Sequence, residues 1–305
     1  MTAVTATTRI GPAEFAWGSR TYVMGILNVT PDSFSGDGLL VTEGQLVAAD
    51  PQVAGRPPLT ADPVRAAVAM ARQMVADGAD ILDIGGESTR PGHAAVGARE
   101  ESARVFPVIA AVRAALPATP ISVDTTKVAV AQAALDAGAD LINDVWGVGA
   151  DESLVRLAAA RRVPLVIMHN RAEASYADLI TEIVADLRVA LDRAIALGMD
   201  PDDLIVDPGF GFGKTPEHNL TVLRELGALR VLGRPILLGT SRKSTLGHVL
   251  DLPPDERLEA TIATTAIGIM EGADIVRVHD IRPNVRAARM TDAVVRGTWH
   301  PDPVS

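Results

Sequence analysis

The sequence predicts an α/β protein, a closed (β/α)8 barrel that is preceded by a short N-terminal β-hairpin. Short apolar runs alternate with helical patterns along the chain, and each run ends in a polar residue. Three units enter their strand with the same tripeptide: Gly78–Asp80, Gly138–Asp140 and Gly272–Asp274. In each unit the glycine ends the preceding helix, as a repeating strand–helix unit requires. Eight such units indicate a barrel. The alternative, an open doubly wound sheet, would need a glycine-rich phosphate loop after its first strand, and none follows here.

The amino-acid composition limits the classes of protein to which this chain can belong. The 305 residues are 48% hydrophobic and 22% charged, which is typical of a globular chain, and we expect one domain over residues 1–305. A net charge of −10 argues against general nucleic-acid or anionic-membrane binding. The absence of cysteine excludes disulfides, thiolate metal sites and a cysteine nucleophile. Because no signal peptide or membrane-spanning run is recognisable, we expect a cytoplasmic protein.

The first elements follow from alternation and turn residues. Residues Phe15–Tyr22 alternate around Gly18-Ser19 and predict a hairpin that leads into the first strand, Tyr22–Leu27. Pro31 lacks a backbone donor, so the strand ends before it and delivers Asn28 to one rim.

A long insertion follows this strand. Residues 35–60 are rich in glycine, proline and alanine and show no steady period, so we expect an inserted, mobile loop. Asp62 and Pro63 then supply the N-cap and first position of a helix that ends at Gly78.

The remaining units repeat this order. Strands are predicted at Ile81–Ile84, Ile121–Val123, Leu141–Ile142, Leu165–Met168, Leu204–Val206, Ile236–Leu238 and Ile275–Val276. Helices are predicted from Arg99 to Leu116, between Asp124 and Ala137, from Asp151 to Arg161 and from Ala177 to Leu197. Further helices are predicted after the cap Thr215-Pro216, between Ser244 and Glu271, and from Pro283 to Arg296.

The polar residues that end the strands should meet, because a barrel of this kind carries its active site at the C-terminal ends of its strands. They are Asn28, Asp83 to Arg90, Asp124, Asn143, His169, Asp207, Lys243, Arg277 and His279. Carboxylates and amides can bind the edge of a flat heterocycle that has several N–H groups. The cations, with Asn28, can hold phosphates and a magnesium ion.

Structural roles remain open for several of these residues. Asp124 could be a helix N-cap or an ion-pair partner, Asn143 a turn residue, and His169 a hydrogen-bonded core histidine. Asp280 could orient His279. Three aspartates lie at strand starts, on the opposite rim, and are expected to be structural: Asp80, Asp140 and Asp274.

Seven motifs lie at the ends of the predicted strands: MGILNVTPDSF, DIGGESTRPG, ISVDTTK, LINDV, DPGFGFGKT, GTSRKS and RVHD. By these motifs, the sequence from Val23 to Ala288 resembles the dihydropteroate synthase family. The resemblance implies a TIM barrel, usually a homodimer, that uses Mg²⁺. It also implies an enzyme that joins p-aminobenzoate to 6-hydroxymethyl-7,8-dihydropterin diphosphate and releases diphosphate.

The resemblance also implies roles for individual residues. The pterin would be bound by Asp124, Asn143, Asp207, Lys243 and Arg277. The diphosphate would be bound by Asn28 with the metal ion, Thr89, Arg90, Arg277 and His279. The p-aminobenzoate pocket, where sulfonamides also bind in the family, would be lined by Phe34, Arg90, Pro91, Phe212, Lys243 and Ser244.

Two segments depart from the family pattern. The first loop reads Ser35-Gly-Asp37-Gly in place of SDGG, so Asp37 takes the place of the loop aspartate with a register shift of one. The segment after Met168 lacks the usual Gly-x-Pro. Two other functions remain open: a pterin-binding paralogue without catalysis, and a methyltetrahydrofolate–corrinoid methyltransferase, which has no need for diphosphate-binding cations.

Overall fold

The computed structural model describes residues 7–29, 63–87, 96–147 and 151–299. Within these ranges, parallel strands form an eight-stranded sheet in the order β8-β7-β6-β5-β4-β3-β10-β9. The strands are β3 (Tyr22–Asn28), β4 (Ile81–Gly85), β5 (Ile121–Asp124), β6 (Leu141–Asp144), β7 (Leu165–Met168), β8 (Leu204–Asp207), β9 (Leu237–Leu238) and β10 (Ile275–Val278). A parallel bridge between Val206 and Ile236 joins β8 to β9 and closes the barrel. The predicted fold class is confirmed, and the open sheet is excluded.

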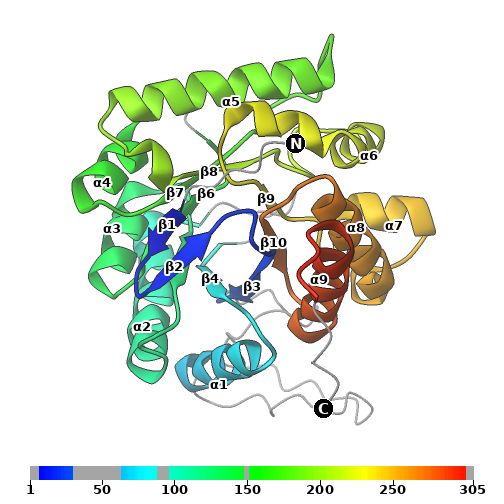
Figure 1. The fold of residues 1–305 in the computed structure, drawn as a ribbon. Helices are drawn as coiled ribbons and strands as arrows, with labels where there is room; N and C mark the ends of the chain where they lie inside the picture. Colours follow the sequence, from blue (N-terminus) through cyan, green and yellow to red (C-terminus); the bar gives the residue numbers. More distant parts are fainter. Residues whose placement is uncertain (1–6, 30–62, 88–95, 148–150, 300–305) are drawn as a thin grey trace.

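Helices surround the strands on the outside (Figure 1). They are α1 (Pro63–Ala76), α2 (Ala98–Ala115), α3 (Val128–Asp136), α4 (Ser153–Arg161), α5 (Leu179–Ala196), α6 (Pro216–Arg224), α7 (Ser244–Leu250), α8 (Leu258–Met270) and α9 (Ile281–Val295), with short 3₁₀ segments η2 (Pro201–Asp203), η3 (Leu226–Leu232) and η4 (Pro254–Glu256). The predicted start of α6 is confirmed by a capping box, in which Thr215 and His218 each bind the backbone N–H of the other. None of the helices in the described ranges is both long and apolar enough to cross a bilayer.

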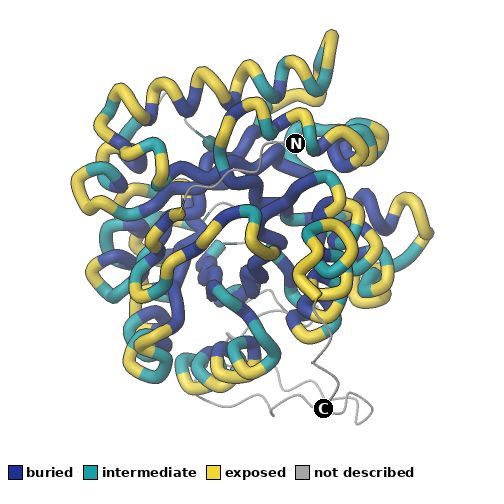
Figure 2. The backbone as a smooth tube through the Cα atoms, viewed as in Figure 1, coloured by how far each residue is buried: buried dark blue, intermediate teal, exposed yellow. Residues whose placement is uncertain are grey.

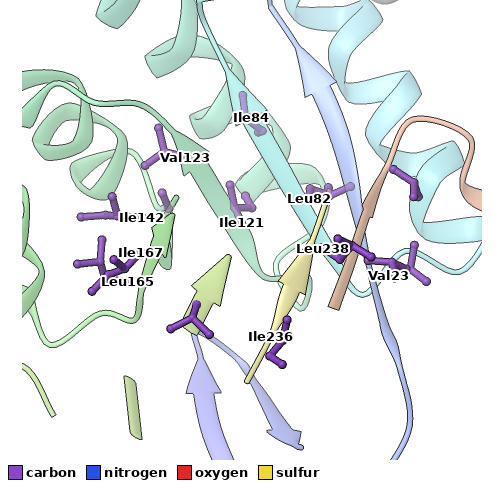
Figure 3. Close-up of a cluster of buried hydrophobic side chains, with 14 of the residues drawn as sticks. Val23, Leu82, Ile84, Ile121, Val123, Ile142, Leu165, Ile167, Ile236 and Leu238 are labelled. Atoms are coloured by element: carbon purple, nitrogen blue, oxygen red, sulfur yellow. The ribbon is translucent and has the colours of Figure 1, made fainter. Parts of the chain in front are cut away.

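The barrel strands, except β5, contribute side chains to two hydrophobic clusters, because successive side chains point to opposite faces. One cluster lies between the strands and the helices and includes Leu82, Ile84, Val123 and Ile167 (Figure 3). The second cluster includes Tyr22, Met24, Ile81, Leu141, Val166, Ile205, Leu237 and Ile275, which alternate with members of the first. The buried segments accordingly run through the strands, and the exposed positions lie on the helices (Figure 2). The second cluster fills the barrel interior.

The N-terminal hairpin closes one end of this interior. It consists of β1 (Thr7–Ile10) and β2 (Ala13–Ala16), and Ile10, Phe15 and Trp17 join the inner cluster. Its turn is at Gly11-Pro12 and not at the predicted Gly18-Ser19, which instead connects β2 to β3. The prediction of the turn was wrong because Thr7, Thr8 and Arg9 are all polar and do not read as an alternating strand. Thr8 is nevertheless buried, and its Oγ1 accepts from Trp17 Nε1 at 2.8 Å.

The three strand-start aspartates are structural, as expected. Each accepts a hydrogen bond from a backbone N–H of a neighbouring strand: Asp80 from Val23 (2.8 Å), Asp140 from Ile121 (2.9 Å) and Asp274 from Ile236 (3.1 Å). The glycine two residues before each aspartate has a φ between +102° and +108°, which favours glycine. The repeated tripeptide therefore ends a helix and ties one strand to the next.

Replacing Asp140 by alanine should destabilise the barrel without touching the opposite rim. The change leaves the Ile121 N–H without its acceptor and Arg113 without its ion-pair partner. We expect the free energy of unfolding in urea to fall by about 1–3 kcal/mol. Asp192→Ala, on the exposed face of α5, is the control and should change it by less than about 0.5 kcal/mol. Equal effects of the two substitutions would refute this role of Asp140.

Candidate active site at the C-terminal rim

Four strands place their terminal residues side by side at one rim. The parallel register aligns Asn28 with Gly85, Gly85 with Asp124, and Asp124 with Asn143. Asp207 is aligned in turn with Met168. Asp124, Asn143 and Asp207 are all buried, whereas Asn28 is partly exposed. The rim that the sequence predicted is therefore assembled from these residues.

A buried guanidinium lies among the carboxylates. Arg277 donates from Nε to Asp83 Oδ2 at 2.5 Å and from Nη2 to Asp124 Oδ2 at 2.6 Å. Burial opposes the positive charge, but the carboxylates of Asp83 and Asp124 raise the pKa of Arg277 above its ordinary value. Burial also raises the pKa of Asp124, and Arg277 acts against this rise. Asp124 is thus an ion-pair partner and not a helix N-cap, since α3 begins at Val128 with Lys127 as its N-cap.

Asp83 is the residue to which the sequence analysis gave no role of its own. It is fully buried and accepts from Asn143 Nδ2 at 3.1 Å as well as from Arg277. Its other oxygen, Oδ1, and Asp124 Oδ1 are buried without a hydrogen-bond partner among the described residues. The signal in the sequence was a carboxylate inside the apolar strand Ile81–Gly85, two positions after the inward-facing Ile81.

Asp207 and Lys243 form the other side of the rim. Asp207 Oδ1 accepts from the Gly209 N–H at 2.7 Å. Burial raises the pKa of Asp207 to about 6, against the effects of this hydrogen bond and of the Lys243 ammonium. Lys243 Nζ lies 3.8 Å from the centre of the Phe212 ring, a cation–π contact. A flat ligand could therefore meet carboxylates, an ammonium and an aromatic ring in one place.

The glycines of the Asp207–Lys214 segment are required by close backbone contacts. A Cβ at Gly209 would lie 1.8 Å from the His169 carbonyl oxygen, and one at Gly213 would lie 2.3 Å from that of Arg171. Both glycines have positive φ, +70° and +54°. The loop after β8 therefore packs directly on the chain that leaves β7, and a larger residue at either glycine would not fit.

Lys214, which the sequence analysis did not single out, fastens this loop. Its Nζ lies 3.0 Å from His169 Nδ1 and donates to the carbonyl oxygens of Gly209 and Phe212, each at 3.1 Å. His169 Nε2 lies 3.2 Å from Asp186 Oδ2, so both ring nitrogens of this buried histidine have partners. Burial, followed by the Lys214 charge, lowers the pKa of His169, which favours a neutral ring. The interpretation of His169 as a hydrogen-bonded core histidine is confirmed.

His279 is held by a serine that the sequence analysis also missed. Its Nδ1 lies 2.9 Å from Ser241 Oγ, which also accepts from the His279 backbone N–H at 3.2 Å. Asp280, which we considered for that orienting role, pairs with Arg242 at 2.9 Å. Ser244 begins α7, directly after Lys243. The remaining predicted site residues lie outside the described residues: Phe34, Asp37, Thr89, Arg90 and Pro91, together with the insertion at 35–60.

Comparisons with known proteins agree on one family. A family model described as pterin binding enzyme matches residues 59–279. A dihydropteroate synthase of Clostridium beijerinckii is 46% identical over 289 residues, which are 94% of this chain and 99% of that protein.

Solved structures give the same result. A dihydropteroate synthase from Clostridium difficile, solved in the presence of pteroic acid, has a TM-score of 0.82 and 46% identity over 92% of this chain and 99% of its own. One from Xanthomonas albilineans, solved with 4-aminobenzoic acid, has a TM-score of 0.83 and 38% identity over 95% and 98%.

Replacing Lys214 by methionine should change how stability depends on pH. Burial lowers the pKa of Lys214 to about 7 in the folded protein, against an ordinary value of 10.5. Between these values the unfolded chain binds more protons than the folded one, so stability rises with pH. We expect the free energy of unfolding of the unmodified protein, relative to Lys214→Met, to rise between pH 7 and 10 by at least about 1.4 kcal/mol. A pH-independent difference in urea denaturation would contradict this.

Proposed function

The chain belongs to the dihydropteroate synthase family of pterin-binding enzymes, and we infer that it is a transferase that makes 7,8-dihydropteroate. It condenses 6-hydroxymethyl-7,8-dihydropterin diphosphate with p-aminobenzoate and releases diphosphate, a step of folate biosynthesis. The observation that carries this conclusion is the set of buried acceptors at the rim, Asp124, Asn143 and Asp207, beside the cations Lys243 and Arg277.

The pterin edge fits these acceptors. A pterin presents an exocyclic amino group beside ring N–H groups, and a carboxylate can accept from two adjacent donors with matched oxygens. The partnerless Oδ1 of Asp124 supports this assignment, because a buried acceptor without a donor costs free energy that a ligand N–H would recover. We propose that Asp124, Asn143 and Asp207 accept from the pterin while Lys243 donates to it, and that Arg277 lies against its ring.

We propose that the diphosphate is bound by Asn28, Thr89, Arg90, Arg277 and His279. Among the described residues no three histidine or carboxylate side chains are close enough to hold a metal ion. Mg²⁺ commonly takes only one or two protein ligands and completes its shell with water and phosphate oxygens. The Asn28 amide oxygen, on a partly exposed side chain at the rim, suits that pattern. A bound Mg²⁺ would neutralise the charge that develops on the leaving diphosphate.

The reaction needs orientation and charge more than a nucleophile from the protein. The C–O bond between the pterin methylene and the diphosphate breaks, and the electron pair leaves with the diphosphate. The arylamine nitrogen then forms the new C–N bond and loses a proton. The cations of the rim stabilise the leaving anion. We propose that Phe34, Arg90, Pro91, Phe212, Lys243 and Ser244 line the p-aminobenzoate pocket, and that Asp37 belongs to a loop that covers it.

A homodimer in the cytoplasm is part of the proposal. Large apolar side chains are exposed on α7, α8 and α9, for example Leu250, Met270 and Val294. Such side chains favour contact with a second copy. The absence of cysteine supports a reducing compartment.

Activity can be measured directly. The protein is incubated with the pterin diphosphate, p-aminobenzoate and Mg²⁺, and diphosphate and dihydropteroate are quantified. We expect equal amounts of both products, and no dihydropteroate without p-aminobenzoate. Pterin binding without turnover would instead support the inactive paralogue. Methyl transfer to a corrinoid from methyltetrahydrofolate would support the methyltransferase.

Asp207→Asn should weaken pterin binding at least about tenfold. The asparagine keeps the shape but offers one acceptor and turns an NH₂ against a donor, and an unmatched buried donor costs about 1–3 kcal/mol. The fold should persist, because the substitution removes a buried carboxylate whose pKa is raised by burial. Calorimetry with 6-hydroxymethylpterin measures the affinity.

The matched control is Asp144→Asn. Asp144 is also buried at the rim, but its carboxylate accepts from the Trp146 N–H at 3.0 Å. We expect its affinity to stay within about threefold of the unmodified protein. Unchanged affinity in Asp207→Asn, or unfolding of that variant, would remove Asp207 from the binding site.

A further inference from the structure

We propose that Asp83 determines specificity by forcing Asn143 to present its amide oxygen, and not its nitrogen, to the pterin. The proposal rests on the proposed function, since it concerns the same pterin site. Asp83 acts through Asn143 and Arg277 and is therefore a positioning residue. It is not one of the residues that the sequence resemblance assigned to the pterin.

The geometry leaves Asn143 one orientation. Asp83 is fully buried, and its Oδ2 lies 3.1 Å from Asn143 Nδ2 and 2.5 Å from Arg277 Nε. A carboxylate paired with a guanidinium has acceptors only, so the amide nitrogen of Asn143 must face it. If the amide were reversed, its oxygen would lie against the carboxylate oxygen, inside a buried site where two acceptors cannot share a proton.

The fixed nitrogen leaves the oxygen of Asn143 for the ligand. Among the described residues nothing donates to Asn143 Oδ1, and nothing donates to the buried Asp124 Oδ1. Asp207 contributes a further carboxylate at the same rim. The C-terminal rim therefore offers hydrogen-bond acceptors from three strands, and a ligand that binds there must supply matching donors.

This acceptor pattern selects the 2-amino pteridines. An amino group and ring N–H groups supply donors along one edge. A 2,4-dioxopteridine carries an oxygen in place of the amino group, so it would set an acceptor against acceptors. Sites that hydrogen-bond a specific group reject analogues that lack it far more strongly than apolar pockets do. Asp83 thus acts on selectivity through Asn143.

The orientation can be tested by removing the acceptor and then restoring it. In Asp83→Leu, Asn143 Nδ2 and Arg277 Nε lose the oxygen to which both donate, so the amide of Asn143 can flip and turn a donor toward the pterin. In Asp83→Asn, the amide oxygen can take the place of Oδ2, accept from both groups and keep Asn143 in its orientation. In Asn143→Asp, two carboxylates face each other.

We expect Asp83→Leu and Asn143→Asp to bind 6-hydroxymethylpterin at least about tenfold more weakly, and Asp83→Asn to bind within about threefold of the unmodified protein. Asp83→Leu should also lose part of the preference for 6-hydroxymethylpterin over 2,4-dioxopteridine, which Asp83→Asn should keep. Ser122→Ala is the control, because Ser122 aligns with Asp83 on the next strand and its buried hydroxyl has no hydrogen-bond partner in the described part of the chain. It should leave affinity and selectivity unchanged.

Equal losses in Asp83→Leu and Asp83→Asn, or unchanged selectivity in Asp83→Leu, would overturn the proposal. Calorimetry is combined with thermal unfolding, so that a loss of fold is separated from a loss of affinity. If the single variants do not fold, neutron diffraction of the unmodified protein with 6-hydroxymethylpterin decides: deuterium on Asn143 must point to Asp83, and deuterium pointing to the ligand refutes the proposal. Failure of the unmodified protein to bind any pterin would instead refute the proposed function.

Discussion

The site depends on one buried interaction, the guanidinium of Arg277 between the carboxylates of Asp83 and Asp124. Taking these charges out of water is costly, and removing one partner would leave an uncompensated charge in the barrel. The barrel makes the arrangement possible because β10, β3, β4 and β5 are successive neighbours in the sheet, so their C-terminal ends lie together. One oxygen of each carboxylate has no hydrogen-bond partner within the described ranges, so the carboxylates neutralise Arg277 and still offer acceptors.

The two ends of the barrel use the same residue type in opposite ways. At the N-terminal end Asp80, Asp140 and Asp274 accept from strand backbones and fasten neighbouring strands. At the C-terminal end Asp83 and Asp124 each keep a buried oxygen that has no hydrogen-bond partner among the described residues. The carboxylates that fasten the strands therefore lie at one end, and carboxylates with an unused acceptor lie at the other.

Sequence patterns were sufficient for the architecture and for most of the rim. Apolar runs ending in polar residues identified every barrel strand, because the strand ends coincide with the change from core to site. They did not identify the hairpin turn. Gly11 and Gly18 both have positive φ and both look like turn residues, and the packing of Ile10 and Phe15 in the barrel interior shows that the turn is at Gly11. Asp83, Lys214 and Ser241 were missed because each contacts a side chain that is distant in sequence: Asn143, His169 and His279, respectively.

The central claim, that buried carboxylates at this rim receive the pterin, is tested most directly by counting protons on binding. Calorimetric titration of 6-hydroxymethylpterin in buffers of different ionisation enthalpy gives the number of protons exchanged. Because the pKa of Asp207 is about 6 in the free protein and ligand donors favour the ionised form, binding at pH 6 should release protons. The account predicts about half a proton or more at pH 6 and close to none at pH 8. Proton uptake, or no exchange at either pH, would contradict it.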